Sequence, residues 1–328
     1  MLMESVSAPE YGALLDAVDI RAREASSNTM DLLLFSLGTS ELFGINVFKV
    51  REITHTPKVT RAPNLPHGVD GVVSLRGSII PVVSLAKLLK FPEGCSNETM
   101  MVTEFSRHVQ GLLLHNVGRI ARVAWDRVWA PDATLAGAES YISALTELPD
   151  GQLVSIIDVE QVIATVYGEA EIPPLEPIAQ VGATVFFADD SAVARRQIVR
   201  VLDRVGLKHH HAVNGREAWE RLQAIAARAE TEGVLLSSRV NIILTDAEMP
   251  QMDGYVLARY VKDDPRFAGI PVVMHSSLAS DANRAMGSTV GADAYVPKFD
   301  PRLLTETLRS LLAKAAASAG HATETTHA

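Results

Sequence analysis

Cysteine is almost absent from this chain: one residue, Cys95, stands among 328. No disulfide can form within the chain, and no group of thiolates is available to hold zinc or an iron–sulfur cluster. A single thiol suits a reducing compartment, and we therefore expect a cytoplasmic protein.

Long apolar runs and an excess of positive charge are missing as well. No uninterrupted apolar stretch reaches the roughly 18 residues of a membrane-spanning helix, and acidic residues precede any sustained apolar run near the start, which is the wrong charge order for a secretory signal. The formal net charge of -9 opposes binding to nucleic acids or to anionic lipids. We expect neither a nucleic-acid partner nor direct insertion into a membrane.

The chain has enough apolar material for two domains. It is about twice as long as a typical domain, and hydrophobic residues make up 47% of it against 21% charged residues, which is typical of folded chains. Residues 1–30 carry an amphipathic stripe that predicts one helix. From residue 31 to 170, short apolar runs separated by turn residues predict antiparallel strands in a barrel or in paired barrels.

The pattern changes after a proline-rich stretch, residues 171–181. Three prolines in five positions disfavour helix and sheet, which predicts a stiff linker. Over residues 182–315, apolar runs of strand length alternate with helical stripes, which predicts an α/β domain with a buried parallel sheet. Residues 316–328 are rich in Ala, Ser, Thr and His and predict a disordered tail.

Three acidic residues follow predicted strands of the α/β domain. Asp189 and Asp190 close the first strand, and Asp246 follows the run from Ile242 to Thr245. Because ligands of parallel sheets gather at the carboxyl ends of strands, the three carboxylates are expected in one crevice, where they repel each other unless a cation joins them. Hard oxygen ligands of this kind favour Mg²⁺ together with a phosphoryl oxygen. We therefore predict a magnesium site in which a carboxylate attacks phosphorus.

Two further side chains stand at strand ends of the same domain. Lys298 follows the fifth predicted strand and would neutralise a transferred phosphoryl group, and Ser276 follows the fourth and offers a hydroxyl. Taken singly, these features have ordinary readings: Asp190-Ser191 as a helix N-cap, Asp246 as a turn residue, and Lys298 as a solvated surface residue. Their joint occurrence at the ends of different strands favours a phosphoryl-transfer site.

Two stretches of this domain resemble the receiver domains of two-component response regulators. They are Phe187-Ala188-Asp189-Asp190-Ser191 and Leu244-Thr245-Asp246-Ala247-Glu248-Met249-Pro250-Gln251-Met252-Asp253-Gly254. The resemblance implies a flavodoxin-like fold with a five-stranded parallel sheet. It also implies that Asp246 is the phosphoacceptor, that Lys298 contacts the phosphoryl group, and that Mg²⁺ is held by Asp189, Asp190, Asp246 and the main-chain carbonyl of Glu248.

The same resemblance implies a switch pair, Ser276 and Tyr295. Ser276 would move toward the phosphoryl oxygens, and Tyr295 would turn inward into the space it leaves. The chain departs from the family at one point, because receivers usually have proline directly after the lysine, whereas here Pro297 precedes Lys298 and Phe299 follows it. We therefore predict an altered phosphoryl lifetime.

The β-rich half resembles the CheW family over most of residues 31 to 167. The resemblance lies in Phe43-Gly44-Ile45-Asn46-Val47-Phe48-Lys49-Val50-Arg51-Glu52-Ile53 and in Gly71-Val72-Val73-Ser74-Leu75-Arg76-Gly77. It implies two SH3-like β-barrel subdomains that tie the cytoplasmic tips of transmembrane chemoreceptors to the histidine kinase CheA, with Arg76 binding a partner. The alternative for Arg76 is an ion pair with a carboxylate of its own domain. A CheW-like domain followed by a receiver is similar to the CheV type of chemotaxis coupling protein.

Together the two resemblances imply a chemotaxis scaffold rather than an enzyme. CheA would phosphorylate Asp246 in the cytoplasm, at membrane receptor arrays, and the phosphoryl group would be lost by slow autodephosphorylation. One alternative is a phosphate sink that drains phosphoryl groups from CheA. Another is a haloacid-dehalogenase-like phosphatase, which would want a second aspartate two residues after the nucleophile, where this chain has Glu248.

Overall fold

The computed structural model describes residues 29–91, 98–105, 108–130, 140–169, 171–179, 182–277, 287–298 and 300–324. The chain divides into two compact units, Met1–Glu169 and Ala170–Ala328. The helix predicted for residues 1–30 lies outside the described residues up to residue 28, and Thr29 and Met30 already belong to a strand. No helix in the described ranges is long and apolar enough to cross a membrane.

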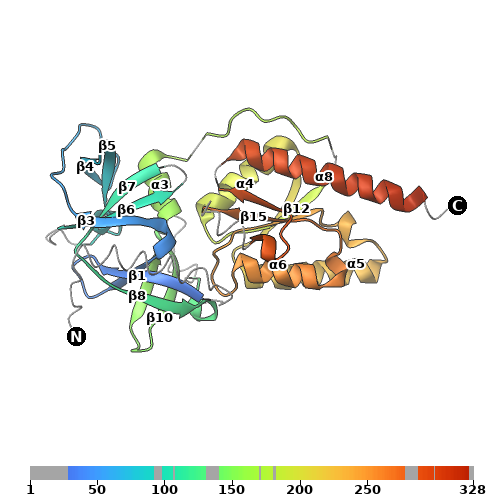
Figure 1. Cartoon of the computed structure of the whole chain (residues 1–328), viewed down its shortest axis with the longest axis horizontal. Coiled ribbons are helices and arrows are strands. Elements are labelled where there is room, and N and C mark those ends of the chain that lie inside the picture. The colour runs from blue at the N-terminus through green and yellow to red at the C-terminus, as the bar shows by residue number, and fades with distance from the viewer. Residues whose placement is uncertain are drawn as a thin grey trace. The chain divides into compact units, whose positions relative to one another are not determined.

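The first unit contains two separate sheets (Figure 1). One has six strands in the order β8-β1-β2-β11-β10-β9 and the other has five in the order β3-β6-β7-β5-β4. The strands of the first are β1 (Thr29–Ser36), β2 (Leu42–Asn46), β8 (Asn116–Ala124), β9 (Val128–Trp129), β10 (Ile142–Glu147) and β11 (Leu153–Ile157). Those of the second are β3 (Val50–His55), β4 (Val69–Leu75), β5 (Ser78–Ser84), β6 (Thr99–Phe105) and β7 (His108–Leu114).

Each sheet of this unit has its own core. Leu32, Leu34 and Val154 are among the buried residues of the first, and Val82, Met100 and others fill the second. The prediction of two β-subdomains is therefore confirmed. Short helices join the strands: α2 (Leu85–Leu88), α3 (Val159–Tyr167), and the 3-10 turns η1 (Val47–Lys49) and η2 (Trp125–Arg127).

The prediction that all these strands are antiparallel is wrong for two pairs. β11 runs parallel to β2, and β5 runs parallel to β7. A strand's apolar pattern determines which face is buried, but it does not determine the neighbour or its direction. Both parallel pairs join strands that are not consecutive in the chain, so they depend on the tertiary fold.

The second unit has the predicted five-stranded parallel sheet. Its strands lie in the order β13 (Lys208–Ala212), β12 (Thr184–Ala188), β14 (Ile242–Thr245), β15 (Val272–Ser276) and β16 (Ala294–Pro297). All four neighbouring pairs are parallel. This is the flavodoxin-like order, in which the chain reverses direction across the sheet between its first and third strands.

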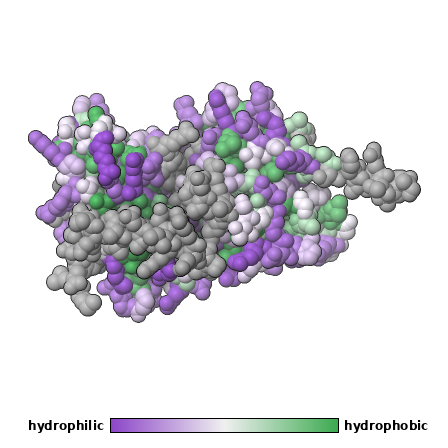
Figure 2. All heavy atoms as spheres, in the orientation of Figure 1, coloured by the Kyte–Doolittle hydropathy of each residue, from purple (hydrophilic) through white to green (hydrophobic). Residues whose placement is uncertain are grey.

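Helices cover both faces of this sheet (Figure 1). The helices are α4 (Ala192–Val205), α5 (Gly215–Glu232), α6 (Gly254–Asp263) and α8 (Pro301–Glu324), with the 3-10 turns η3 (Leu236–Ser238) and η4 (Pro265–Phe267). Apolar stripes of α5 and α6 share one core with the sheet, and those of α4 and α8 share another. On the face drawn in Figure 2, hydrophilic side chains are spread over the described surface, and the apolar patches between them are small.

Helix α8 does not end near residue 316, where the sequence predicts a disordered tail. It runs to Glu324, and the remaining four residues lie outside the described part of the chain. The extension is rich in alanine, which has the highest helix propensity. The composition that indicated disorder is thus also compatible with helix.

The proline-rich segment is packed against the second unit. Ile172 and Ile178 are 9% and 7% exposed and belong to the core that α4 and α8 share. The backbone N–H of Ile178 donates to the carbonyl of Val205 at 3.0 Å. The segment is therefore a docked part of the α/β unit, where the sequence predicts only a stiff spacer.

Candidate functional site

The order of the strands brings the predicted carboxylates together. β12 and β14 are neighbours, with Ala188 opposite Thr245, and the N–H of Asp246 donates to the carbonyl of Ala188 at 2.8 Å. The acidic residues that follow these strands therefore share one edge of the sheet. One carboxylate oxygen each of Asp189, Asp190 and Asp246 lies within 4.8 Å of the others.

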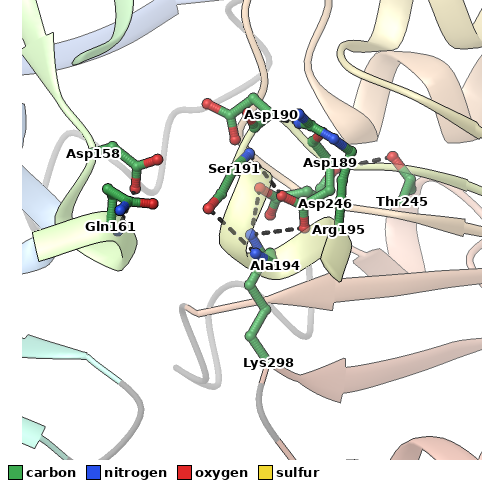
Figure 3. Close-up of polar contacts among 10 residues, drawn as sticks. All are labelled: Asp158, Gln161, Asp189, Asp190, Ser191, Ala194, Arg195, Thr245, Asp246 and Lys298. Carbon is green, nitrogen blue, oxygen red and sulfur yellow. Dashed lines mark hydrogen bonds and ion pairs between the residues drawn. The ribbon is translucent and has the colours of Figure 1, made fainter. Parts of the chain in front are cut away.

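A buried lysine reaches into this cluster from the end of β16 (Figure 3). The Nζ atom of Lys298 lies 2.8 Å from Oδ2 of Asp246 and 3.0 Å from Oδ2 of Asp189. All three residues are buried, with exposed fractions of 5%, 5% and 0%. The ordinary reading of Lys298 as a solvated surface residue is thereby excluded.

Local hydrogen bonds hold the first carboxylate and its neighbours in place. Oδ1 of Asp189 accepts the N–H of Ser191 at 2.9 Å, and Ser191 caps helix α4. Arg195, one turn into that helix, donates to the main-chain carbonyls of Asp189 and Asp190 at 2.8 Å each (Figure 3). The sequence did not indicate this role of Arg195, because it depends on the helix turning back over the strand end.

The residues present fit a divalent cation. Three carboxylates face one ammonium group in a largely buried site, so negative charge is in excess, and an excess of this kind is costly unless a cation offsets it. The donors are hard carboxylate oxygens, which Mg²⁺ prefers. Ligation by Asp189, Asp190 and Asp246 is compatible with this geometry. Ligation by the main-chain carbonyl of Glu248 stays a prediction.

Ser276 and Tyr295 come together on the neighbouring strands. Ser276 ends β15 and is fully buried, and its side chain is hydrogen-bonded to that of Tyr295 on β16. Burial raises the pKa of Tyr295, and the hydrogen bond to Ser276 opposes that rise. The pair that the resemblance names as a switch is therefore in direct contact.

Gly254 brings helix α6 against the main chain of Asp246. A Cβ at this position would lie 1.8 Å from the carbonyl oxygen of Asp246, so only glycine fits. The N–H of Gly254 donates to the carbonyl of Ala247 at 2.9 Å, which closes the loop that follows the acid. The conformation of this loop also requires a positive φ of 66° at Gln251.

Tyr255, the next residue, was not singled out by the sequence. Its hydroxyl is buried and contacts that of Tyr295, in a geometry that falls short of a full hydrogen bond. Burial raises the pKa of Tyr255, and the nearby Tyr295 and Glu248 raise it further. A phenol beside three carboxylates and a second phenol is recognisable only from the fold.

We expect Tyr255→Phe to stabilise the protein by about 1 kcal/mol, because a buried hydroxyl without a full hydrogen bond costs about 1–3 kcal/mol. The measurement is urea unfolding followed by circular dichroism. Tyr260→Phe is the matched control, since Tyr260 lies on the same helix and is 43% exposed, and it should change the free energy of unfolding by less than about 0.5 kcal/mol. A clear loss of stability in Tyr255→Phe would mean that the hydroxyl has a partner in solution.

Arg76 lies far along the chain from these residues, in the turn between β4 and β5. Its backbone has a positive φ of 49°, and its guanidinium contacts Oε2 of Glu52 at 2.6 Å. The side chain nevertheless stays 77% exposed. An ion pair within its own domain is thus present, and the guanidinium remains accessible to a partner. Partner binding by Arg76 stays a prediction.

Two family models match the chain, one for each unit. The CheW-like domain matches residues 31–166, and the response regulator receiver domain matches residues 185–309. Together they span the β-rich unit and the α/β unit in the order that the sequence predicts.

Curated relatives agree with this division. "Chemotaxis protein CheV3" of Helicobacter pylori is 29% identical over 280 residues, which cover 83% of this chain and 89% of the relative. "Chemotaxis protein CheW" of Klebsiella aerogenes is 31% identical over 41% of this chain and 82% of its own length. "Chemotaxis protein CheY1" of Helicobacter pylori is 34% identical over 38% of this chain and 92% of its own length. The chain thus combines a CheW-like domain with a response regulator receiver domain that follows it, and over most of its length it is similar to CheV3.

Proposed function

We propose that this protein is a chemotaxis scaffold that couples chemoreceptors to the histidine kinase CheA, and that phosphorylation of Asp246 regulates the coupling. The observation that supports the proposal most is the buried contact of Lys298 with Asp246 and Asp189, in the same chain as a CheW-like domain. The protein works in the cytoplasm at membrane receptor arrays. It accepts a phosphoryl group and catalyses no turnover beyond slow loss of that group.

The chemistry at Asp246 is a phosphoryl transfer from a phosphohistidine of the kinase. A carboxylate oxygen of Asp246 forms a P–O bond as the P–N bond breaks, and the leaving imidazole nitrogen keeps the electron pair. Bound Mg²⁺ supplies positive charge that offsets the carboxylates and the phosphoryl oxygens. Asp189 and Asp190 hold the cation, and Lys298 provides a second counter-charge, because its ammonium already contacts Oδ2 of Asp246.

Phosphorylation then changes the hydrogen bonding of the switch pair, Ser276 and Tyr295. The hydroxyl of Ser276 turns from Tyr295 to a phosphoryl oxygen, which is a stronger acceptor because it is charged. Tyr295 loses that partner and turns inward into the space that the Ser276 hydroxyl leaves. A change of charge at one aspartate thus becomes a change of shape at the edge of the receiver.

Co-sedimentation with reconstituted receptor–CheA arrays tests the coupling half of this proposal. We expect Arg76→Ala to weaken array binding about tenfold, which corresponds to about 1.4 kcal/mol, and to leave phosphotransfer from CheA unchanged. Arg51→Ala is the matched control, because Arg51 is also exposed and pairs with Glu104 in the same sheet. If Arg76→Ala and wild type bind the arrays equally, Arg76 does not contribute to the interface.

Adding acetyl phosphate to the same experiment separates the two candidate functions. A regulated scaffold changes its affinity for the array when Asp246 is phosphorylated, and Asp246→Asn does not respond. A phosphate sink loses the phosphoryl group quickly and binds the array equally well in both states. Identical affinities with and without the donor would therefore favour the sink.

A further inference from the structure

The groove between α4 and α8 is occupied by the chain's own segment 171–178, here called the strap. Ile172, Leu175 and Ile178 pack into the core that the two helices share with the sheet. Figure 1 shows the strap running over the side of the receiver sheet that α4 and α8 cover. The contact lies within the second unit of the chain.

Among the described residues, two hydrogen bonds secure the strap. Arg309 on α8 donates to the carbonyl of Glu176 at 2.9 Å, and Ile178 donates its N–H to Val205 at the end of α4 at 3.0 Å. Pro173, Pro174 and Pro177 have no N–H to donate, so the strap cannot add to a sheet. The binding of the strap to the groove therefore depends on the packing of a few apolar side chains. The prolines lower the conformational entropy that the strap loses when it docks.

The strap begins beside a pocket on the side of the receiver sheet that α4 and α8 cover. This pocket has a cavity volume of about 60 Å³ and is partly open to solvent, and Glu171 lines it together with His275 and Asp300. His275 directly precedes Ser276, and Asp300 stands two residues after Lys298. The remaining wall is formed by α4 and the start of α8.

The pocket thus lies next to the ends of β15 and β16, where Ser276 and Lys298 would contact a phosphoryl group. Neighbouring residues of a strand point to opposite faces, so a movement of Ser276 toward the phosphoryl group moves the buried His275 on the strap side. A shift of Lys298 from Asp189 likewise moves Asp300 and the first turn of α8. The pocket leaves room for small shifts of the side chains that line it.

We infer that the strap is a latch, which the unphosphorylated receiver holds in the α4–α8 groove and which phosphorylation of Asp246 loosens. This inference rests on the proposed function of Asp246. The strap follows directly on the CheW-like unit, so its release lengthens the tether between the two units. Phosphorylation would then act on the scaffold through the freedom of this connection.

Hydrogen exchange of the full-length protein with Mg²⁺, before and after acetyl phosphate, tests the latch. We expect the amides of residues 171–179 to exchange about tenfold faster after phosphorylation, as for a local opening, while α5 on the other face of the sheet is unchanged. Asp246→Asn should show no acceleration. Intact-mass spectrometry measures the phosphorylated fraction. If the chain takes up no phosphoryl group, the proposed function is wrong. If the chain is phosphorylated but exchange in the strap is unchanged, the latch is wrong.

A second variant tests the latch without phosphorylation. Ile172→Ser combined with Ile178→Ser should speed exchange in the strap and leave phosphotransfer to Asp246 intact. Leu235→Ser is the control, because Leu235 is 78% exposed and lies outside the groove. Slow strap exchange in the double variant, equal to that of wild type, would overturn the role of these two side chains in holding the latch.

Discussion

Asp246→Asn is expected to abolish phosphoryl acceptance from CheA. The amide has nearly the shape of the carboxylate but is a far weaker nucleophile, and no acyl phosphate can form on it. The protein should remain folded, because the substitution removes one of three carboxylates that repel each other in a buried site. Transfer of radiolabelled phosphate from purified CheA measures the effect.

The matched control for this experiment is Asp263→Asn. Asp263 is exposed at the end of α6, away from the strand ends that form the site. The Asp263→Asn variant should accept phosphate on Asp246 at the wild-type rate. If Asp246→Asn still became labelled, the phosphoryl group would be carried by another residue, and the assignment of the whole site would be wrong.

Lys298→Met is expected to destabilise the metal-free protein by about 3–5 kcal/mol, the usual cost of removing one partner of a buried ion pair. Methionine fills much of the same volume, but the carboxylates of Asp189 and Asp246 lose the ammonium that lies within 3.0 Å of both. Urea unfolding in EDTA measures the change. Lys262→Met is the control, since its pair with Asp293 is partly exposed and such pairs contribute about 0–1 kcal/mol.

Magnesium should recover part of the stability lost in Lys298→Met. A ligand that binds only the folded state stabilises it by about 2.7 kcal/mol at a hundred times its dissociation constant. Because the variant holds more uncompensated negative charge, the gain should be larger in Lys298→Met than in wild type. Equal stability of the variant and wild type in EDTA would show that the buried contact of Lys298 contributes little to the fold.

Much of the receiver site could be predicted from local patterns. An apolar run followed by an acid indicates a strand with a carboxylate at its end, and in a parallel sheet all such ends lie on one edge. Asp189, Asp190 and Asp246 therefore meet as expected, and the lysine that follows β16 joins them across 52 residues of chain. The contact between Ser276 and Tyr295 agrees with the resemblance to receiver domains.

Other features of the molecule depend on partners that no local pattern specifies. The ion pair of Arg76 joins it to Glu52, 24 residues away, and the strap is held by Arg309, 133 residues beyond Glu176. The proline content predicted a spacer, because prolines disfavour helix and sheet. It does not indicate where the apolar side chains between the prolines will pack. Tyr255 became notable only when β16 placed a second tyrosine beside it.

The sequence by itself determined the two kinds of domain, the direction of the receiver strands and the residues at their ends, since periodicity and strand ends are properties of short segments. Only the tertiary structure decided the parallel pairs β2–β11 and β5–β7, the docking of the strap and the buried setting of Lys298. These features arise from packing between distant segments. Their stability depends on how well two distant segments fit together, and the sequence of either segment alone does not determine that fit.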